Sequence, residues 1–469
     1  MLACVHLTFQ TVCRFSSLRV GSVTETTQQW RRKQTGIILQ FVLPALSIVL
    51  SDPLMTLLDT IFIGQFSSTD DMASLGPNTL VFNSAQWIFN ALAVGTTSVI
   101  VHDLKQGNAK KASESLSLAL SIALVFGFAE LIGFRMFSVA IIKATGTPER
   151  VVELAAKYMD VRALAAPAVL LTLVCQAAML AQKDSFTPCK VVLVSFLVKT
   201  VADVLLLLCK EFRAVEAAAA TVVSQMVGGF LMLHWNNSDP EKVRWTLRLK
   251  PTRENLVPFA HCLGPLTGVY VIKNLCYILV NIAATSQVFL AVAAHQAMYS
   301  LWVLMAFCAI PLERAAITFI PPARPGDVRA LEQLLIAMAS VAGVLLGVLV
   351  FVISYFAPDL LTQDERVWDL IREIAPHALI SILLNALDAA YNGILLARQE
   401  YSFLLSAMLL TLLCLYVYNG FIAEMSLGLP GVWGGLVLFV GIRCTATQVL
   451  NLFRSHCDAL HLCLEPPSP

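Results

Sequence analysis

The chain has 469 residues, of which 57% are hydrophobic and only 13% are charged, and its formal net charge is +1. A soluble domain carries about 25% charged residues, so this chain has too little polar surface for water, and lipid is its expected solvent. The near-neutral charge also excludes a nucleic-acid partner, which requires a clustered basic field.

The first 36 residues differ from the rest in composition. They hold a single acid, Glu25, among many Ser and Thr residues, against five basic residues: Arg14, Arg19, Arg31, Arg32 and Lys33. Such a stretch is typical of a transit peptide. A disordered, positively charged cytosolic tail has the same composition, so both interpretations stay open.

Twelve apolar stretches follow, each near the roughly 20 residues that a membrane helix needs. They are predicted at 38–64, 76–101, 115–142, 158–181, 188–209, 214–235, 258–283, 287–316, 331–357, 370–396, 402–423 and 430–453. The long polar interruption at 236–254 is the expected linker between an N-terminal six-helix lobe (37–235) and a C-terminal one (255–453), followed by a tail (454–469). The fold class is therefore an all-α integral membrane protein with two pseudo-symmetric lobes.

Alternate loops differ in their content of Lys and Arg. The set that includes the linker is the richer one. By the positive-inside rule, both termini and the linker should face the cytosol or the stroma.

The two halves share one layout. Pro44 is followed eight residues later by Asp52, and Pro265 is followed eight residues later by Lys273. The segment around Leu180–Phe186 also resembles the segment around Leu396–Phe403. Two apolar halves of equal plan are typical of a transporter built from internal repeats, whose site lies between the repeats.

Two acids lie in the first span, and each is a functional candidate because a charge at bilayer depth is costly. Asp52 and Asp59 are seven residues apart, which is about two helical turns and nearly one face. Pro44 and Pro53 predict a broken helix here, which would expose the carboxylates to a cavity.

The fifth span holds Lys199 and Asp203 at i,i+4 spacing. One interpretation is an internal ion pair that eases membrane insertion. The favoured interpretation for Asp203 is coupling, because a carboxylate in a low-dielectric interior can load and release a proton. It can equally serve as an oxygen ligand for a small cation.

Lys273 is the lone charge of the seventh span and occupies the repeat position of Asp52. We expect it either to meet Asp52 across the cleft or to contact an anionic substrate. Four other charged residues are interpreted as interfacial, because they lie nearer to predicted span ends: Glu130, Glu313, Asp388 and Arg443.

Six amide and aromatic side chains lie within apolar spans. They are candidates for lining a substrate cavity, although contacts between helices are the more frequent role of such groups. These residues are Asn83, Gln86, Trp87, Asn281, Asn385 and Asn392.

Sequence motifs of enzymes and ATPases are absent. The chain has no H-E-x-x-H, G-x-S-x-G or Walker A pattern, and its eight histidines are spread out. Energy from ATP is therefore not expected, and a membrane-embedded enzyme is a poor alternative.

The twelve cysteines form no C-x-x-C pair and are interpreted as small apolar helix residues. One cluster near the C-terminus could hold a metal, although an unstructured end is the favoured interpretation. Its residues are His456, Cys457, His461 and Cys463.

Several motifs together resemble one family. The run Asp52–Gln65 with Leu75-Gly76-Pro77 looks like the first motif of the multidrug and toxic compound extrusion (MATE) family. Further matches are Ala293–Gln296, Phe319–Pro321, Gly393–Ala397 and Gly428–Trp433. The resemblance is greatest to the branch similar to bacterial DinF and to plant chloroplast members, one of which is associated with salicylate export.

The resemblance implies alternating access between two lobes, driven by a proton or sodium gradient. It implies that Asp59 and Asp203 form the cation site of the N-terminal lobe. The chain departs from the family pattern at Lys199, where relatives have Asn, at Arg213–Glu216 in place of Gly-x-x-Gly, and at Arg314 in place of Gln.

The expected function is a secondary active efflux transporter, an antiporter, that exports small organic molecules, drugs or phenolic organic acids. We expect no cofactor apart from the coupling ion, H⁺ or Na⁺, and a monomer in the plastid envelope or the plasma membrane. A lipid-linked sugar flippase is the alternative within transport.

Overall fold

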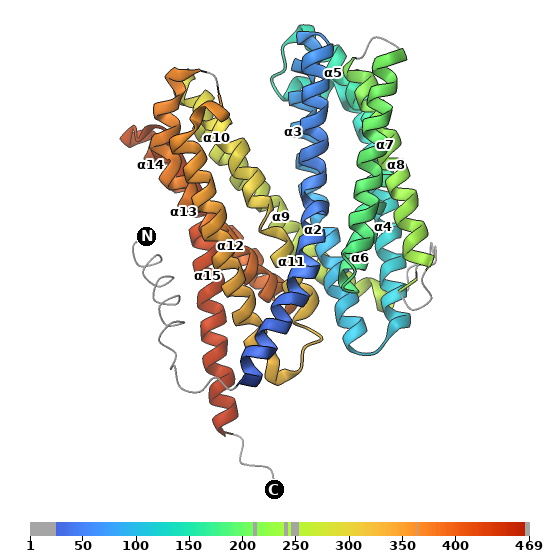
Figure 1. Cartoon of the computed structure of the whole chain (residues 1–469), viewed down its shortest axis with the longest axis vertical. Coiled ribbons are helices and arrows are strands. Elements are labelled where there is room, and N and C mark those ends of the chain that lie inside the picture. Colours follow the sequence, from blue (N-terminus) through green and yellow to red (C-terminus); the bar gives the residue numbers. More distant parts are fainter. Residues whose placement is uncertain (1–24, 210–212, 239–242, 245–252, 363, 465–469) are drawn as a thin grey trace. The chain divides into compact units, whose positions relative to one another are not determined.

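The computed structural model describes the backbone of residues 25–209, 213–238, 243–244, 253–362 and 364–464. Within these ranges the chain is helical and holds no strand. Figure 1 shows that long helices make up most of the described chain.

In the first half of the chain the described residues form seven helices and a 3-10 turn, η1 (Ala163–Ala165), that divides one span in two. They are α2 (Glu25–Phe66), α3 (Thr69–Lys105), α4 (Ala109–Ala144), α5 (Glu149–Arg162), α6 (Ala166–Ala181), α7 (Phe186–Cys209) and α8 (Ala214–Ser238).

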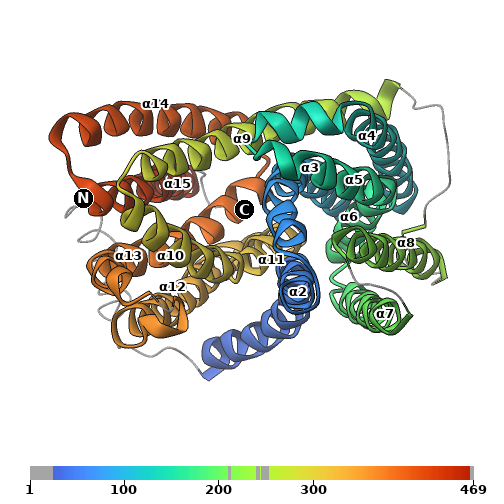
Figure 2. The same cartoon turned by 90° about the horizontal axis from the view of Figure 1, so that it is seen from above.

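The described residues of the second half also form seven helices, which are labelled in Figure 2, and a 3-10 turn, η2 (Pro358–Leu360). The helices are α9 (Arg253–Thr285), α10 (Phe289–Phe307), α11 (Ile310–Phe319), α12 (Pro325–Phe356), α13 (Glu365–Ala397), α14 (Tyr401–Met425) and α15 (Gly428–Leu464).

Twelve helices in the described ranges are long and apolar enough to span a bilayer, which confirms the predicted count. Several begin earlier than predicted because polar caps start them outside the apolar stretch. The side chain of Ser68 accepts a hydrogen bond from the backbone N–H of Asp71, and that of Asn108 accepts one from Lys111. Hydropathy marks only the lipid-facing part of such a helix.

The first span is one continuous helix, so the predicted break is wrong. α2 contains both Pro44 and Pro53, each of which lacks a backbone donor. Hydroxyl groups nearby contact backbone carbonyls: Ser47 Oγ donates to Pro44 O at 2.7 Å and Ser51 Oγ donates to Ile48 O at 2.8 Å. The remaining backbone bonds are sufficient to maintain the helix.

Contacts divide the chain into two units. Unit 2 comprises Phe41–Val271 and Ile317–Pro322, and unit 1 comprises the described residues of Met1–Gln40, Ile272–Ala316 and Ala323–Pro469. In unit 2, α6 packs against α3, α4 and α8, around the fully buried Leu116, Leu170 and Met179. In unit 1, α13 packs against α10, α12 and α15.

Two turns at equivalent places of the repeats have the same backbone geometry. Lys183 follows α6 with φ of 64°, and Gln399 follows α13 with φ of 61°. Each turn residue donates its N–H three residues back, Lys183 to Leu180 O and Gln399 to Leu396 O, at 3.0 Å. The predicted repeat therefore extends to this turn.

The first of these turns also holds a cation that contacts an aromatic ring. The Lys183 ammonium lies 5.2 Å from the centre of the Phe319 ring, and burial lowers the pKa of Lys183.

The two chain ends bear on two of the predictions. Residues 1–24 of the basic N-terminal stretch lie outside the described residues, whereas 25–36 are already helical in α2. At the other end, α15 continues to Leu464. The prediction of an unstructured C-terminal end is therefore wrong for the backbone up to this residue. The side chains of His456, Cys457, His461 and Cys463 lie outside the described residues. The described side chains contain no group that could hold a metal ion.

Candidate functional site

A buried triad of charges joins α2 to α7 inside unit 2. Lys199 Nζ donates to Asp59 Oδ1 at 2.6 Å and to Asp203 Oδ2 at 2.7 Å. Lys199 and Asp203 are fully buried, and Asp59 is 3% exposed. The predicted i,i+4 ion pair is present, and its ammonium also reaches the acid of the first span.

The triad carries an excess of negative charge. Two carboxylates and one ammonium sum to −1, and Asp203 Oδ1 is buried without a hydrogen-bond partner among the described residues. Because an unpaired charge in a low-dielectric interior is costly, the triad is chemically suited to take up one positive charge, and a vacant acceptor oxygen is available for it.

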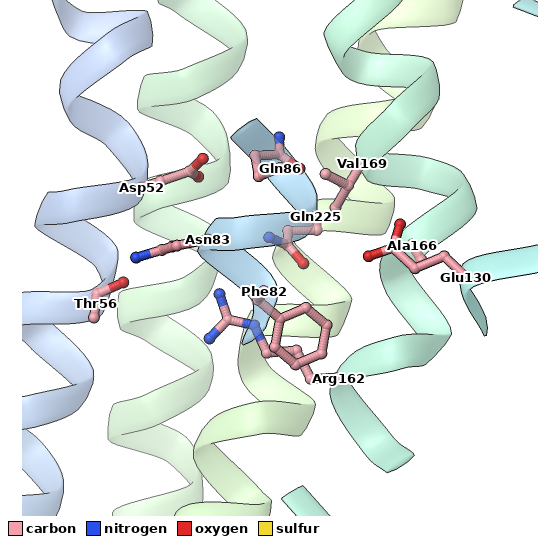
Figure 3. A pocket seen from close by; sticks show the side chains of 10 residues that line it. All are labelled: Asp52, Thr56, Phe82, Asn83, Gln86, Glu130, Arg162, Ala166, Val169 and Gln225. Atoms are coloured by element: carbon pink, nitrogen blue, oxygen red, sulfur yellow. The ribbon is translucent and has the colours of Figure 1, made fainter. Parts of the chain in front are cut away.

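A pocket lies beside the triad, also within unit 2. It is lined by two acids of predicted spans, Asp52 and Glu130, by the amides of Asn83 and Gln86, and by further residues of α2, α3, α5, α6 and α8: Thr56, Phe82, Arg162, Ala166, Val169 and Gln225 (Figure 3). Three predicted cleft residues, Asp52, Asn83 and Gln86, thus meet at one place. Trp87, one position further along α3, is not part of this lining.

Arg162 is a pocket residue that the sequence patterns did not reveal. It ends α5, near the middle of the membrane span Glu149–Ala181. Its Nη1 donates to Tyr158 Oη at 3.0 Å, and its guanidinium lies 5.0 Å from the centre of the Phe82 ring. The sequence did contain a signal for this residue: Arg162 is the only arginine of the predicted span 158–181, and it follows Tyr158 by four residues, which is one helical turn.

A second charge cluster lies in unit 1. Arg443 forms an ion pair with Asp388 and lies 5.3 Å from the centre of the Phe439 ring. Lys273 lies in the electrostatic field of both residues and of Glu313 and Arg314. Lys273 is the only charged residue within its predicted span, but charged residues from other helices surround it.

Most of the residues interpreted as interfacial are in fact buried. The exposed fraction is 8% for Glu313, 3% for Asp388 and 5% for Arg443, and Glu130 lines the pocket of unit 2. The interpretation was wrong because hydropathy locates a residue along a helix but does not show which face packs inside the bundle.

The amides of unit 1 contact neighbouring helices or their own. Asn392 Nδ2 donates to Glu313 Oε2 at 3.2 Å, and Asn385 Nδ2 donates to Ala306 O at 3.2 Å. Asn281 Nδ2 donates to Tyr277 O at 2.9 Å, and its Oδ1 lies 3.4 Å from His295 Nε2. These bonds fit helix packing, while a role of Asn281 and Asn392 in a substrate cleft stays a prediction.

Two departures from the family pattern have local structural roles. The backbone N–H of Ala214 donates to Asp71 Oδ1 at 3.2 Å, and Arg213 lies 3.8 Å from the same carboxylate, so the start of α8 is fastened to α3. Arg314 is 9% exposed and belongs to the surroundings of Lys273.

Comparison with known proteins agrees with this fold. The MatE family model matches residues 44–205. Protein DETOXIFICATION 47, chloroplastic, of Arabidopsis thaliana is 27% identical over 415 residues, which cover 87% of this chain and 76% of that protein. Multidrug export protein MepA of Staphylococcus aureus strain N315 is 21% identical over 421 residues, which cover 88% and 92% respectively.

Solved structures share the arrangement of helices over most of their length. A MOP superfamily transporter from Pyrococcus furiosus superposes with a TM-score of 0.81 at 18% identity, over 89% of this chain and 95% of that one. An outward-facing multidrug resistance MATE family transporter gives the same identity, the same coverage and the same TM-score. The MatE match to residues 44–205, the relatives that span most of the chain and the shared twelve-helix fold all point to the MATE family, whose members are membrane transporters and not enzymes.

Proposed function

We propose that this chain is a proton-driven antiporter that exports small organic molecules, drugs or phenolic organic acids among them, by alternating access. The MatE match and the relatives that span most of the chain support a multidrug and toxic compound efflux transporter. The single observation that carries the choice of ion is the position of Lys199 between Asp59 and Asp203.

A sodium ion needs several oxygen ligands, and the triad offers a poor site for one. Lys199 Nζ already contacts one oxygen of each carboxylate at 2.6 and 2.7 Å. A second cation at this distance would meet the ammonium at short range in a low-dielectric interior, where like charges repel strongly. A proton avoids this conflict because it binds covalently to a single oxygen.

Proton binding changes what joins α2 to α7. When the buried Asp203 Oδ1 takes up a proton, the triad becomes neutral and the hydrogen bond between Lys199 and Asp203, within α7, loses part of its charge assistance. The Lys199 ammonium then has Asp59 of α2 as its one charged partner in the triad, which tightens the contact between the two helices and favours a conformational change of the lobe. Release of the proton on the other side of the membrane restores the shared arrangement.

The experiment is efflux from proteoliposomes that hold the purified chain, under an imposed proton gradient and then an imposed sodium gradient. We expect proton-driven transport that Asp59→Asn and Asp203→Asn abolish while the protein remains folded. The matched control is Asp369→Asn, whose carboxylate is exposed and pairs with Arg372. Sodium-driven transport, or proton-driven transport that survives both triad substitutions, contradicts the proposal.

The names of three Arabidopsis relatives mark them as chloroplastic. We therefore propose that this chain lies in the plastid envelope, and the location of a fluorescent fusion of the full chain tests this.

The alternative function, a lipid-linked sugar flippase, needs a strongly cationic cavity. The pocket of unit 2 contains one cation and two acids, which favours the exporter over the flippase.

A further inference from the structure

Arg162 differs from the buried ammonium of the triad in how it is paired. Lys199 contacts two carboxylates, at 2.6 and 2.7 Å. No carboxylate oxygen of the described residues lies within 4 Å of the Arg162 guanidinium, which contacts the hydroxyl of Tyr158 and the ring of Phe82 instead. An arginine within a membrane span is costly and normally pairs with an anion, so this neutral pairing requires an explanation.

Two acids of α2 act on Arg162 from different levels of that helix. The guanidinium lies in the electrostatic field of both Asp52 and Asp59, which are about two turns apart. Asp52 lines the pocket, whereas Asp59 belongs to the triad. In Figure 3 the guanidinium points toward Asn83 and toward Thr56, which lies between the two acids in the sequence. Arg162 is thus placed where both the pocket and the triad can attract it.

Tyr158 extends this link from Arg162 to the triad. It is 1% exposed and packs in one buried cluster with Ile63, which follows Asp59 by one turn of α2. It also lies in the electrostatic field of Asp59 and Lys199, and its hydroxyl accepts a hydrogen bond from Arg162 Nη1 at 3.0 Å. A series of polar side chains therefore leads from the triad toward the pocket: Asp203, Lys199, Asp59, Tyr158 and Arg162.

The charge of the triad decides which acid attracts Arg162 more strongly. While both triad carboxylates are ionised, they share one ammonium, so Asp59 is incompletely neutralised. Once Asp203 is protonated, Lys199 neutralises Asp59 alone, and Asp52 is the α2 carboxylate that has no contacting cation among the described residues. A guanidinium has five N–H donors, so Arg162 can turn toward either acid and keep its hydrogen bond to Tyr158.

We propose that Arg162 is a movable counter-ion shared by Asp59 and Asp52, which turns toward Asp59 while the triad has its excess negative charge and toward Asp52 once the triad is neutral. Asp52 is then open to a cationic ligand of the pocket in the first state and occupied in the second. Arg162 is a positioning residue in this role, because it acts through Asp52. The role deepens the proposed proton antiport and rests on it only for its use in transport.

Other groups around Arg162 affect how the role can be tested. Among the described residues, Glu130 of α4 is the second acid of the pocket, while α3 and α8 contribute only neutral amides to the lining. Because Asp52 and Glu130 can titrate as well, a change of pH alters several groups at once. The substitution Asp203→Asn neutralises the triad alone and is therefore the cleaner perturbation.

The test is a double-mutant cycle of ligand binding at one fixed pH. The purified full chain in nanodiscs is dialysed against labelled tetraethylammonium, a permanent cation that does not titrate. We expect Asp203→Asn to weaken its binding by roughly tenfold in the otherwise unchanged chain. In the Arg162→Gln background the same substitution should weaken binding by about twofold or less, because the shared counter-ion is gone.

Two further variants separate this role from a structural one. Arg162→Lys keeps a movable cation, so Asp203→Asn should still weaken binding in that background, although by less than in the unchanged chain. Arg135→Gln removes an exposed arginine of α4 outside the pocket, and in that background Asp203→Asn should act as in the unchanged chain. A loss of packing at Arg162 alone does not produce this pattern.

A second cycle needs no ligand. Asp52→Asn and Asp203→Asn should shift the midpoint of denaturant unfolding non-additively, since the two acids compete for one cation, and additively in the Arg162→Gln background. Equal effects of Asp203→Asn on binding with and without Arg162, or additive midpoints in the unchanged chain, overturn the shared counter-ion. Proton-driven efflux in that case leaves the export function standing, whereas sodium-driven efflux with both cycles non-additive removes the proton antiport and keeps the role of Arg162.

Discussion

The two buried charge clusters follow the same plan of repeats but differ in sign. In unit 2, the ammonium of Lys199 forms ion pairs with the two carboxylates of Asp59 and Asp203, so this triad has an excess negative charge. In unit 1 the cations outnumber the acids: Lys273, Arg314 and Arg443 stand against Asp388 and Glu313. The repeat therefore preserves the backbone arrangement and not the electrostatics.

The first position of each repeat shows the divergence most clearly. Asp52 and Lys273 stand eight residues after matching prolines, yet one lines a pocket with Arg162 and the other faces Arg443 and Asp388. In the proposed antiporter, this asymmetry would leave only the unit 2 cluster with the excess negative charge that can take up a cation.

The largest expected effect comes from removing the central cation of each cluster. Lys199→Met leaves two adjacent buried carboxylates without a contacting cation, and we expect a loss of about 3–5 kcal/mol in the free energy of unfolding. Arg443→Met leaves Asp388 in the field of Lys273, so a smaller loss of about 1–3 kcal/mol is expected. Denaturant unfolding in nanodiscs measures both losses.

A pH series and a double variant sharpen this contrast. Lys199→Met should regain stability at low pH, because protonation removes the repulsion, and the added substitution Asp59→Asn should restore part of the loss at neutral pH. Equal losses for the two single variants would show that the clusters are electrostatically alike.

An intermediate effect is expected where glycines bring helices together in the two units. A Cβ at Gly393 would lie 2.7 Å from Glu313 O and from Ala316 Cβ, whereas a Cβ at Gly228 would meet only the movable hydroxyl of Ser195 closer than 3.7 Å. We expect Gly393→Ala to cost about 1–3 kcal/mol and Gly228→Ala to cost less.

Gly420→Ala is the control for this pair, since nothing lies within 4 Å of its Cβ position. It should be neutral or slightly stabilising in the same unfolding measurement. A loss at Gly228 as large as that at Gly393 would mean that the unit 2 contact is as rigid as the unit 1 contact.

The smallest effect concerns the paired left-handed turns. Gln399→Gly relieves a residue of positive φ and should gain up to about 1 kcal/mol. Lys183→Gly relieves the same geometry but loses the contact of the ammonium with Phe319, so its net change should be close to zero. A gain at Lys183 that matches the one at Gln399 would show that this contact contributes nothing to stability.

The sequence predicted the fold well because its dominant signal is local. Twelve spans and the matching turns of the repeat follow from hydropathy and spacing, and the i,i+4 pair of Lys199 and Asp203 follows from helix geometry alone. The predicted linker at 236–254 stays a prediction. The contact between Lys199 and Asp59 joins residues 140 positions apart. Only the family resemblance indicated it, since no local pattern carries that information.

The sequence predicted individual buried charges less well. Arg162 was missed, and Asp388 and Arg443 were interpreted as interfacial, because hydropathy averages over a window that hides one charged face of an apolar helix. The interruption of the fourth span by η1 next to Arg162 also depends on packing around Pro167, whose backbone lies against Gly127.

In the proposed proton antiport, the single vacant charge of the triad would set a thermodynamic ceiling for export. One proton per cycle supplies about 1.4 kcal/mol for each unit of pH difference, which supports roughly a tenfold concentration ratio of a neutral substrate. The entering proton also moves one elementary charge, so a membrane potential of 100 mV adds about 2.3 kcal/mol, and an anion that leaves moves a second charge in the same sense and adds about 2.3 kcal/mol more. A stoichiometry of one proton would thus make export of anions steeper than export of neutral molecules whenever the interior is electrically negative.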